Sequence, residues 1–291
     1  MKNLAIHRPG ALGDIMCIIM LQDAIHDVYG TFDLFVHESC YSAIVPLLKY
    51  NKNKFNFYPV SELNRNNYNK VVDLVGYPVH LGYPKESMKK HLMLYMLDEL
   101  GITYKTLPEQ LILEAPPPPA KLLKTKNYIT VQLKTGWSRY KELKAEQLDS
   151  MCLAVKTWYS SDIIQIGAKN EPKLNNVDVH MLGYSLEEAI GAQAWAKYHI
   201  GPDSFFNHTT NLKWVHKGNN TKGLIYFGST SPIGSGYDQN INIYAGAHCQ
   251  PCYRENPEIS SAHGGPCPFN HMCLSRMPVE FLQSYIIKLF E

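Results

Sequence analysis

The sequence predicts an α/β protein made of two Rossmann-like domains, each a wound parallel sheet, that face each other across a cleft. Short apolar runs alternate with helical patterns through residues 2–100, which is typical of a doubly wound parallel sheet. Four consecutive prolines, Pro116 to Pro119, then interrupt the chain. The same alternation restarts after them. Because ligands bind at the carboxyl ends of parallel strands, the cleft between two such domains is the expected site.

In the first domain, apolar runs predict strands at residues 2–6, 32–36, 55–58 and 70–75. Apolar residues at helical spacing predict helices near 14–28, 40–50 and 86–100. Consecutive prolines continue neither a helix nor a central strand, so they form a stiff, extended linker. We therefore place the boundary there, with an N-terminal domain over residues 1–118 and a C-terminal domain over residues 119–291.

In the second domain, the pattern predicts strands at 128–133, 162–166, 179–182, 198–200 and 224–227, and helices at 145–158, 185–197 and 278–290. Ser185 and Glu188 have the spacing of a capping box, which indicates a helix start. Pro278 stands at the first turn of the last helix, where proline is favoured. We expect this last helix to cross back and brace the first domain.

Composition indicates a globular protein without an obvious polyanionic partner. The chain has 291 residues, 45% hydrophobic and 19% charged, with a net charge of +2. This balance neither requires a nucleic-acid partner nor excludes a local basic groove. Polar residues interrupt the first apolar run, and no stretch approaches the length of a membrane-spanning helix. We therefore expect a cytoplasmic protein.

The stretch HRPGALGDIM, residues 7–16, joins a predicted strand to a predicted helix through a glycine-containing turn. This geometry exposes backbone N–H groups and the positive end of a helix dipole. Asp14 has two interpretations there. It is either the N-cap of the helix or a carboxylate beside a cleft that accepts a proton from a substrate.

Six segments, in order along the chain, resemble the heptosyltransferase-like glycosyltransferases, family 9 of the carbohydrate-enzyme classification. They are Ile6–Asp14, Lys141–Glu146, Gly167–Glu171, Pro202–His208, Phe227–Thr230, and Cys249-x-x-Cys252 followed by Cys267 and Cys273. The chain departs from the family at Leu143, where an aromatic residue is usual, and at Phe205 and Phe206, where small residues are usual. It is also shorter than typical members, mostly in the half that receives the acceptor.

The resemblance implies the GT-B fold and an inverting glycosyltransferase that moves a sugar from a nucleoside-diphosphate sugar to an acceptor hydroxyl, with a saccharide or lipid-linked glycan favoured as acceptor. It implies that Asp14 is the general base, and Arg8 either pairs with it or contacts phosphate. The candidate donor-binding residues are Thr135, Gly136, Arg139, Lys141, Glu171, Asp203, Ser204, His208, Gly228 and Thr230. No cofactor or catalytic metal is required, because Lys141 and helix N-termini can hold the diphosphate.

Several of these residues also have structural interpretations. Lys141 or its rival Arg139 could be a solvated cation, and Glu171 a surface carboxylate. His208 could be a satisfied, partly buried histidine. Asp203-Ser204 follows a predicted strand, and we expect it to cap the next helix.

The C-terminal cysteines Cys249, Cys252, Cys267 and Cys273 could hold a structural zinc, because paired cysteines suit a tetrahedral site. Reduced buried thiols or a disulfide are the alternatives, and a reducing cytoplasm disfavours the disulfide.

Two other functions stay open. The shortened acceptor half and the Lys/Asn/Tyr-rich composition also suit a glycosyltransferase that acts on a hydroxymethylated base in phage DNA. A basic groove leading to Asp14 would favour this function. An amphipathic, membrane-facing patch would favour the lipid-linked acceptor instead. The third candidate is a non-catalytic nucleotide-sugar binding module, which an Asp14 buried away from the cleft would support.

Overall fold

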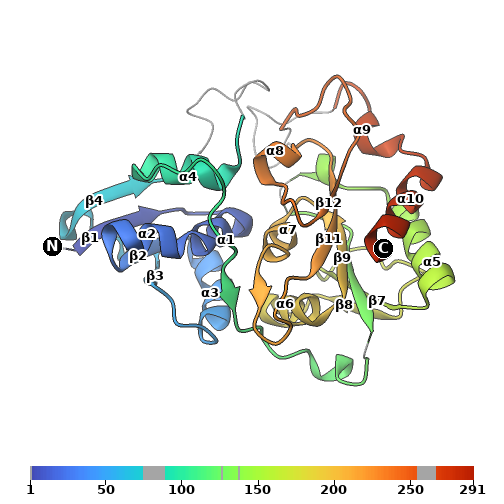
Figure 1. Ribbon diagram of the computed structural model, residues 1–291, viewed down its shortest axis with the longest axis horizontal. Helices are drawn as coiled ribbons and strands as arrows, with labels where there is room; N and C mark the ends of the chain where they lie inside the picture. The colour runs from blue at the N-terminus through green and yellow to red at the C-terminus, as the bar shows by residue number, and fades with distance from the viewer. Residues whose placement is uncertain (1, 75–88, 126, 137, 254–266) are drawn as a thin grey trace.

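A computed structural model describes residues 2–74, 89–125, 127–136, 138–253 and 267–291 of the protein. Two large sheets, each entirely parallel, confirm the predicted fold class (Figure 1). The first has the strand order β3-β2-β1-β4 and the second β12-β11-β9-β6-β7-β8. We call the first sheet with helices α1 to α4 the first half, and everything from β6 onward the second half.

The first half winds four strands and four helices around β1. Its elements are β1 (Lys2–His7), α1 (Leu12–Met20), α2 (Gln22–Tyr29), β2 (Phe32–Val36), α3 (Glu38–Leu48), β3 (Phe55–Pro59), β4 (Tyr68–Asp73) and α4 (Leu92–Leu100). Strand β2 is buried along its whole length, as expected for a parallel strand covered on both faces. Ala5 of the central strand β1 lies opposite Asp33 on one side and Val71 on the other. The turn after His7 therefore lies at the carboxyl edge of this sheet.

The second half winds six strands in the same way. Its elements are β6 (Tyr128–Gln132), α5 (Ala145–Tyr159), β7 (Asp162–Gly167), β8 (Val179–Leu182), α6 (Leu186–Trp195), β9 (Tyr198–Pro202), α7 (Phe205–Thr209), β11 (Lys222–Phe227), α8 (Pro232–Ser235), β12 (Ile241–Tyr244), α9 (Met272–Ser275) and α10 (Val279–Phe290). Strands β7 and β8 extend the sheet to one side of β6, and β9, β11 and β12 extend it to the other. The pair β6/β9 is therefore the topological switch point, where open α/β sheets bind ligands.

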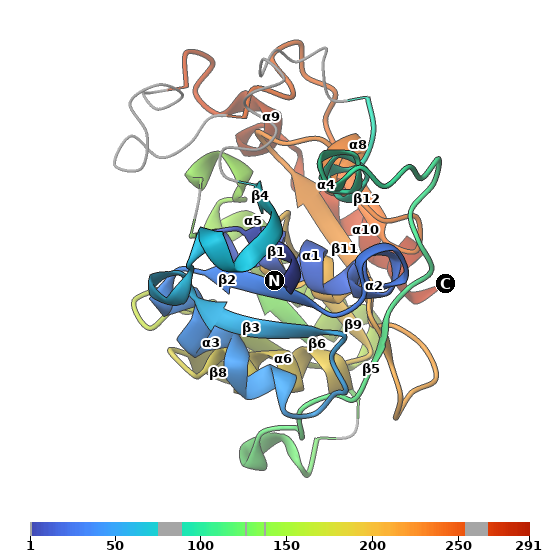
Figure 2. The same ribbon diagram turned by 90° about the vertical axis from the view of Figure 1, so that its left-hand side faces the viewer.

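Two apolar clusters cover the two faces of the second sheet. Ile163 belongs to the cluster with α5 and α10, and its neighbour Ile164 belongs to the cluster with α6. The second of these clusters continues into the first half, where it includes Ile6 and Ile19. Helix α1 packs against α7, and α3 against α6, and Figure 2 looks onto the first half with the second sheet behind it. The two halves therefore meet through one shared hydrophobic core.

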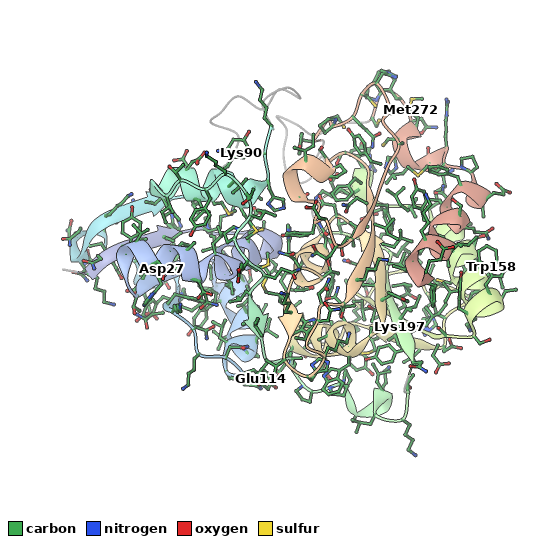
Figure 3. The ribbon with its side chains drawn as sticks, in the orientation of Figure 1. Asp27, Lys90, Glu114, Trp158, Lys197 and Met272 are labelled. Carbon is green, nitrogen blue, oxygen red and sulfur yellow. The ribbon has the colours of Figure 1, made fainter. Side chains whose placement is uncertain are left out.

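The connecting segment packs on both halves. Glu114, labelled in Figure 3, lies where the chain passes between them, and its N–H donates to Asn51 Oδ1 at 2.8 Å. Trp195 of α6 donates its indole N–H to Pro116 O at 3.0 Å. Just before these prolines, β5 (Ile112–Leu113) pairs with β10 (Lys213–Trp214). The four-stranded sheet precedes the prolines and the six-stranded sheet follows them, while β5 and β10 form a two-stranded sheet with one strand from each side. The boundary at residue 118 itself stays a prediction.

Three predictions about elements were wrong. The expected helix 14–28 is two helices that meet at Leu21, and α1 already begins at Leu12. The last helix does not return to the first half but packs against α5, β11 and β12. Strand β12 was not predicted. Residues 75 and 86–88, the expected end of one strand and start of one helix, lie outside the described residues. No helix in the described ranges is long and apolar enough to cross a membrane.

Candidate active site

Asp14 lies in the first turn of α1, directly after the carboxyl edge of β1. The N-cap of this helix is Ala11, whose φ of 61° is left-handed, and no side chain caps the helix. The interpretation of Asp14 as a helix cap is therefore wrong. Its carboxylate pairs with the Arg8 guanidinium, which also donates to Leu74 O. The Asp14 side chain is 22% exposed, so it is not fully buried, and its place beside the cleft stays a prediction.

Lys141, Asp203 and Thr230 come together at the switch point. Asp203 Oδ2 accepts hydrogen bonds from Lys141 Nζ at 3.0 Å and from Thr230 Oγ1 at 2.7 Å. The three residues follow β6, β9 and β11, whose carboxyl ends share one edge of the sheet. Burial opposes the ionisation of Asp203, but the Lys141 ammonium and the Thr230 hydrogen bond help to hold its pKa below the ordinary value. The Asp203 carboxylate is therefore ionised at neutral pH.

The turn at Gly228 packs directly on the 3-10 turn Arg139–Lys141. A Cβ at Gly228 would lie 1.9 Å from Tyr140 O, and Ser229 N–H donates to the same oxygen at 2.9 Å. Only glycine allows this approach. The contact places the Gly228–Thr230 turn beside Lys141, whereas its predicted hydrogen bonds to phosphate remain a prediction.

The loop after β6 is held by its own residues. Thr135 N–H donates to Glu142 Oε1 at 2.7 Å, and Thr135 Oγ1 donates to Ser138 O at 3.0 Å. Thr135 therefore stabilises the loop in this structure, and its two predicted phosphate donors already have partners. Gly136 has open space where a Cβ would be, so a ligand could approach its backbone closely.

Arg139 faces a different space from Lys141. It lines a pocket of about 340 Å³ between the loop after β6 and the segment around α9. The lining residues are Lys134, Arg139, Tyr140, Glu142, Leu143, Lys144, Cys267, Asn270 and His271. Among the described lining residues, Lys134, Arg139 and Lys144 are basic and Glu142 is acidic, so basic side chains predominate. It suits an anionic group, but it is not the space beside Asp203.

Glu171 and Ser204 depart from simple expectations. One oxygen of Glu171 accepts from Ala168 N–H at 2.7 Å, and the other is buried without a hydrogen-bond partner in the part of the chain that the structure describes. Burial raises the Glu171 pKa, so the residue is not a freely solvated carboxylate. Ser204 is the N-cap residue of α7, which confirms the expected position of the cap. No side-chain cap bond forms there, because the Ser204 hydroxyl donates to Gln132 Oε1 at 2.7 Å and Asp203 Oδ1 accepts from the Asn207 side chain at 3.0 Å.

His208 is buried between the two halves. Its Nδ1 lies 2.8 Å from Tyr237 Oη and 3.4 Å from Cys17 Sγ. This is the satisfied, buried histidine of the structural interpretation, and a contact with the donor remains a prediction. Sequence reasoning missed Cys17 and Tyr237. Cys17 lies three residues after Asp14 on one helix, a spacing that could have pointed to it, whereas no local pattern marks Tyr237.

The four C-terminal cysteines are free thiols, as are the other three. Burial and the nearby charges of Cys249, Cys252 and Cys267 raise the pKa of Cys273 to about 12, so the four groups are within electrostatic reach of one another. In the described ranges, no group of three or more His, Cys, Asp or Glu side chains is arranged to hold a metal ion. A metal at these cysteines stays a prediction.

Comparisons with known proteins give a match in structure alone. No model of a known protein family and no curated protein matches the chain. The iron-containing dodecameric glycosyltransferase TibC of enterotoxigenic E. coli, also solved with ADP-D-β-D-heptose, superposes with a TM-score of 0.73 at 12% identity, over 99% of this chain and 76% of its own. E. coli ADP-heptose LPS heptosyltransferase II gives 0.62 at 14% identity, over 99% and 98%. A family 9 glycosyltransferase of Veillonella parvula gives 0.63 at 14%, over 99% and 97%. The chain therefore has the GT-B fold of the heptosyltransferases.

Proposed function

We propose that the protein is an inverting glycosyltransferase that moves a sugar from a nucleoside-diphosphate sugar to the hydroxyl of a saccharide or lipid-linked glycan. One observation carries the proposal. Lys141, Asp203 and Thr230 converge at the switch point of the second sheet, and helix α1, which bears Asp14, packs on the helix that follows Asp203. Because TibC was solved with ADP-D-β-D-heptose, that nucleotide sugar is the first donor to test.

In this proposal Asp14 is the general base. Its Oδ2 is paired with Arg8, which orients the carboxylate and leaves Oδ1 to take the proton. As the acceptor oxygen attacks the anomeric carbon, its proton passes to Asp14. The bond between the anomeric carbon and the β-phosphate oxygen breaks on the opposite face, and its electron pair leaves with the nucleoside diphosphate. Attack on one face and departure from the other invert the configuration.

The leaving diphosphate needs positive charge or N–H dipoles aimed at it. Lys141 can supply the charge, because its ammonium is held by Asp203 Oδ2 and by Asp203 O, each at 3.0 Å. We expect backbone N–H groups of the N-terminal turn of α7, and those of Gly228 and Thr230, to add hydrogen bonds, since Ser229 N–H already donates to Tyr140 O. The buried oxygen of Glu171, which has no hydrogen-bond partner among the described residues, suits a hydrogen bond from a ribose hydroxyl.

We also propose that Cys249, Cys252, Cys267 and Cys273 bind a structural metal. TibC is described as iron-containing, and thiolates favour zinc or iron. A divalent cation would offset the repulsion between the four thiolates, which together with burial raises the pKa of Cys273. The metal would hold the C-terminal segment and supply no step of the transfer. A cytoplasmic location belongs to the same proposal and is supported by the seven free thiols.

A thermal-shift screen of ADP-D-β-D-heptose and of ADP-, UDP- and GDP-hexoses tests the proposal. A true donor raises the melting temperature, because it binds the folded state alone. Lys141→Ala should remove the shift, and the matched variant Lys54→Ala, from an exposed ion pair with Asp23, should retain it. The proposal is wrong if no nucleotide sugar shifts the wild type.

Turnover then separates the remaining possibilities. Release of nucleoside diphosphate with glycan acceptors supports the proposal. Release only with hydroxymethylated DNA would assign the DNA-modifying activity instead. A donor that binds without turnover on any acceptor would identify a binding module.

A further inference from the structure

The contact between α1 and α7 is centred on Gly13 and His208. A Cβ at Gly13 would lie 2.9 Å from His208 Cδ2 and 3.1 Å from His208 Nε2. Real Cβ atoms do not approach a ring so closely, so the imidazole occupies the space that a side chain at position 13 would need. Gly13 immediately precedes Asp14, the proposed base. The position of the base therefore depends on where this ring lies.

The ring is held by residues of both halves. His208 Nδ1 lies against Tyr237 Oη and Cys17 Sγ, and Tyr237 in turn donates to Met93 Sδ at 3.8 Å. The ring centroid of His91 lies 5.0 Å from that of Tyr237. Cys17, His91 and Met93 belong to the first half, whereas Tyr237 and His208 belong to the second. The buried contact thus crosses from one half to the other.

These groups are uncharged at neutral pH. Burial lowers the pKa of His208, and it raises the pKa of Tyr237 and of Cys17. The negative charges of Asp203 and Asp14 raise the pKa of His208, but they only partly offset the lowering caused by its burial. His208 thus lies between the proposed base and the proposed donor site as a neutral, fixed ring.

We propose that His208 is a positioning residue that sets the location of Asp14 relative to the Lys141–Asp203 site by filling the space beside Gly13. The role rests on the proposed glycosyl transfer, since it concerns the base of that reaction. His208 touches neither the acceptor nor the reacting carbon in this role. It fixes the position of the first turn of α1 relative to the first turn of α7. A misplacement of the base by about 1 Å lowers the rate about a hundredfold.

A double-mutant cycle in thermal stability tests the contact without any substrate. Gly13→Ala should lower the melting temperature of the wild type, because the new methyl group meets the ring. In a His208→Ala background the same substitution should leave the melting temperature unchanged or raise it, because alanine at position 13 is the better helix former. Alanine at position 208 removes both ring atoms that face Gly13, Cδ2 and Nε2, while Tyr237 keeps its hydrogen bond to Met93 Sδ. Gly10→Ala is the matched control, since no atom of the described residues lies within 4 Å of a Cβ there.

Kinetics test the positioning role. With ADP-D-β-D-heptose as donor, Gly13→Ala should lower kcat at least tenfold with the donor KM within about threefold of wild type, since the donor residues are untouched. Gly13→Ala combined with His208→Ala should recover part of that kcat, because the added methyl group no longer meets the ring. A merely structural contact would change stability without this split between kcat and KM.

The inference is overturned if Gly13→Ala lowers the melting temperature equally in both backgrounds. It is also overturned if an active wild type keeps its kcat after Gly13→Ala. A wild type that is inactive with every donor but shows the thermal coupling would refute the proposed function and, with it, any positioning of a base, while the packing contact itself would stand.

Discussion

Replacing Lys141 with methionine removes the positive charge that pairs with the buried Asp203 carboxylate. The two side chains are 12% and 3% exposed, so this ion pair is largely shielded from water. Removing one partner of such a pair typically costs about 3–5 kcal/mol, because the other charge is left buried and uncompensated. Asp203 would keep its hydrogen bonds from Thr230 and Asn207, so we expect a loss of about 3 kcal/mol at pH 7, at the low end of that range.

The loss should depend on pH in a defined direction. In the wild type the pKa of Asp203 lies below its ordinary value of 3.8, so its contribution to stability is present above that value and is lost as the pH falls through the folded-state pKa. In Lys141→Met, burial dominates and raises the pKa of Asp203. The native variant then takes up a proton at a higher pH than the wild type does. The stability difference between variant and wild type should therefore narrow on acidification.

Urea unfolding at pH 7.5, 6 and 5 measures this difference. The control is Lys54→Met, which breaks the exposed pair with Asp23 and should change stability by no more than the error of the measurement. The reasoning fails if Lys141→Met is as stable as wild type at pH 7.5, or if its deficit is the same at all three pH values.

Three further predictions concern the base, the cysteines and the buried histidines. Asp14→Asn should fold and bind donor but lose transfer about a hundredfold in initial-rate assays; retained transfer would remove the base assignment. Elemental analysis should find about one metal ion per chain in the wild type, as expected for a four-cysteine site. Cys273→Ser should lose this ion and Cys40→Ser should keep it, and a wild type without metal would contradict the prediction. Burial lowers the pKa of His91 and His199 from 6.5 to about 3, so stability should be full above pH 6.5 and fall by about 2 kcal/mol per histidine by pH 5. Equal unfolding midpoints at pH 7.5 and 5 would show that these rings are not buried as neutral groups.

Secondary structure was predictable where one local pattern decides it. Strands β2 and β8 match the predicted residues 32–36 and 179–182, because each is a short apolar run bounded by polar residues. The capping box of Ser185 and Glu188 forms in both directions. The break at Leu21 was not predictable, since apolar residues keep their helical spacing on both sides of it. In strand β12 isoleucines alternate with asparagines, and these residues form a strand because they pair with the neighbouring strand β11.

The site was predictable to the extent that strand ends define it. Lys141, Asp203 and Thr230 each follow a parallel strand, and such ends must meet at one edge of the sheet. The behaviour of Ser204 was not predictable, because its hydroxyl is taken by Gln132, 72 positions earlier in the chain. The contact of His208 with Tyr237 and Cys17 depends on the packing of the two halves, which no local pattern contains.

The apolar cluster shared by the first sheet and helices α6 and α7 also decides how the molecule comes apart. Ile19 and Met20 of α1 lie in one cluster with Ala192 of α6 and Phe206 of α7, so neither half can melt without exposing apolar surface of the other. The protein should therefore unfold in a single cooperative transition, even though its chain is wound into two sheets. A fragment that ends at the proline segment would carry its half of this cluster into water, and the division visible in the sequence is not a division into independently stable pieces.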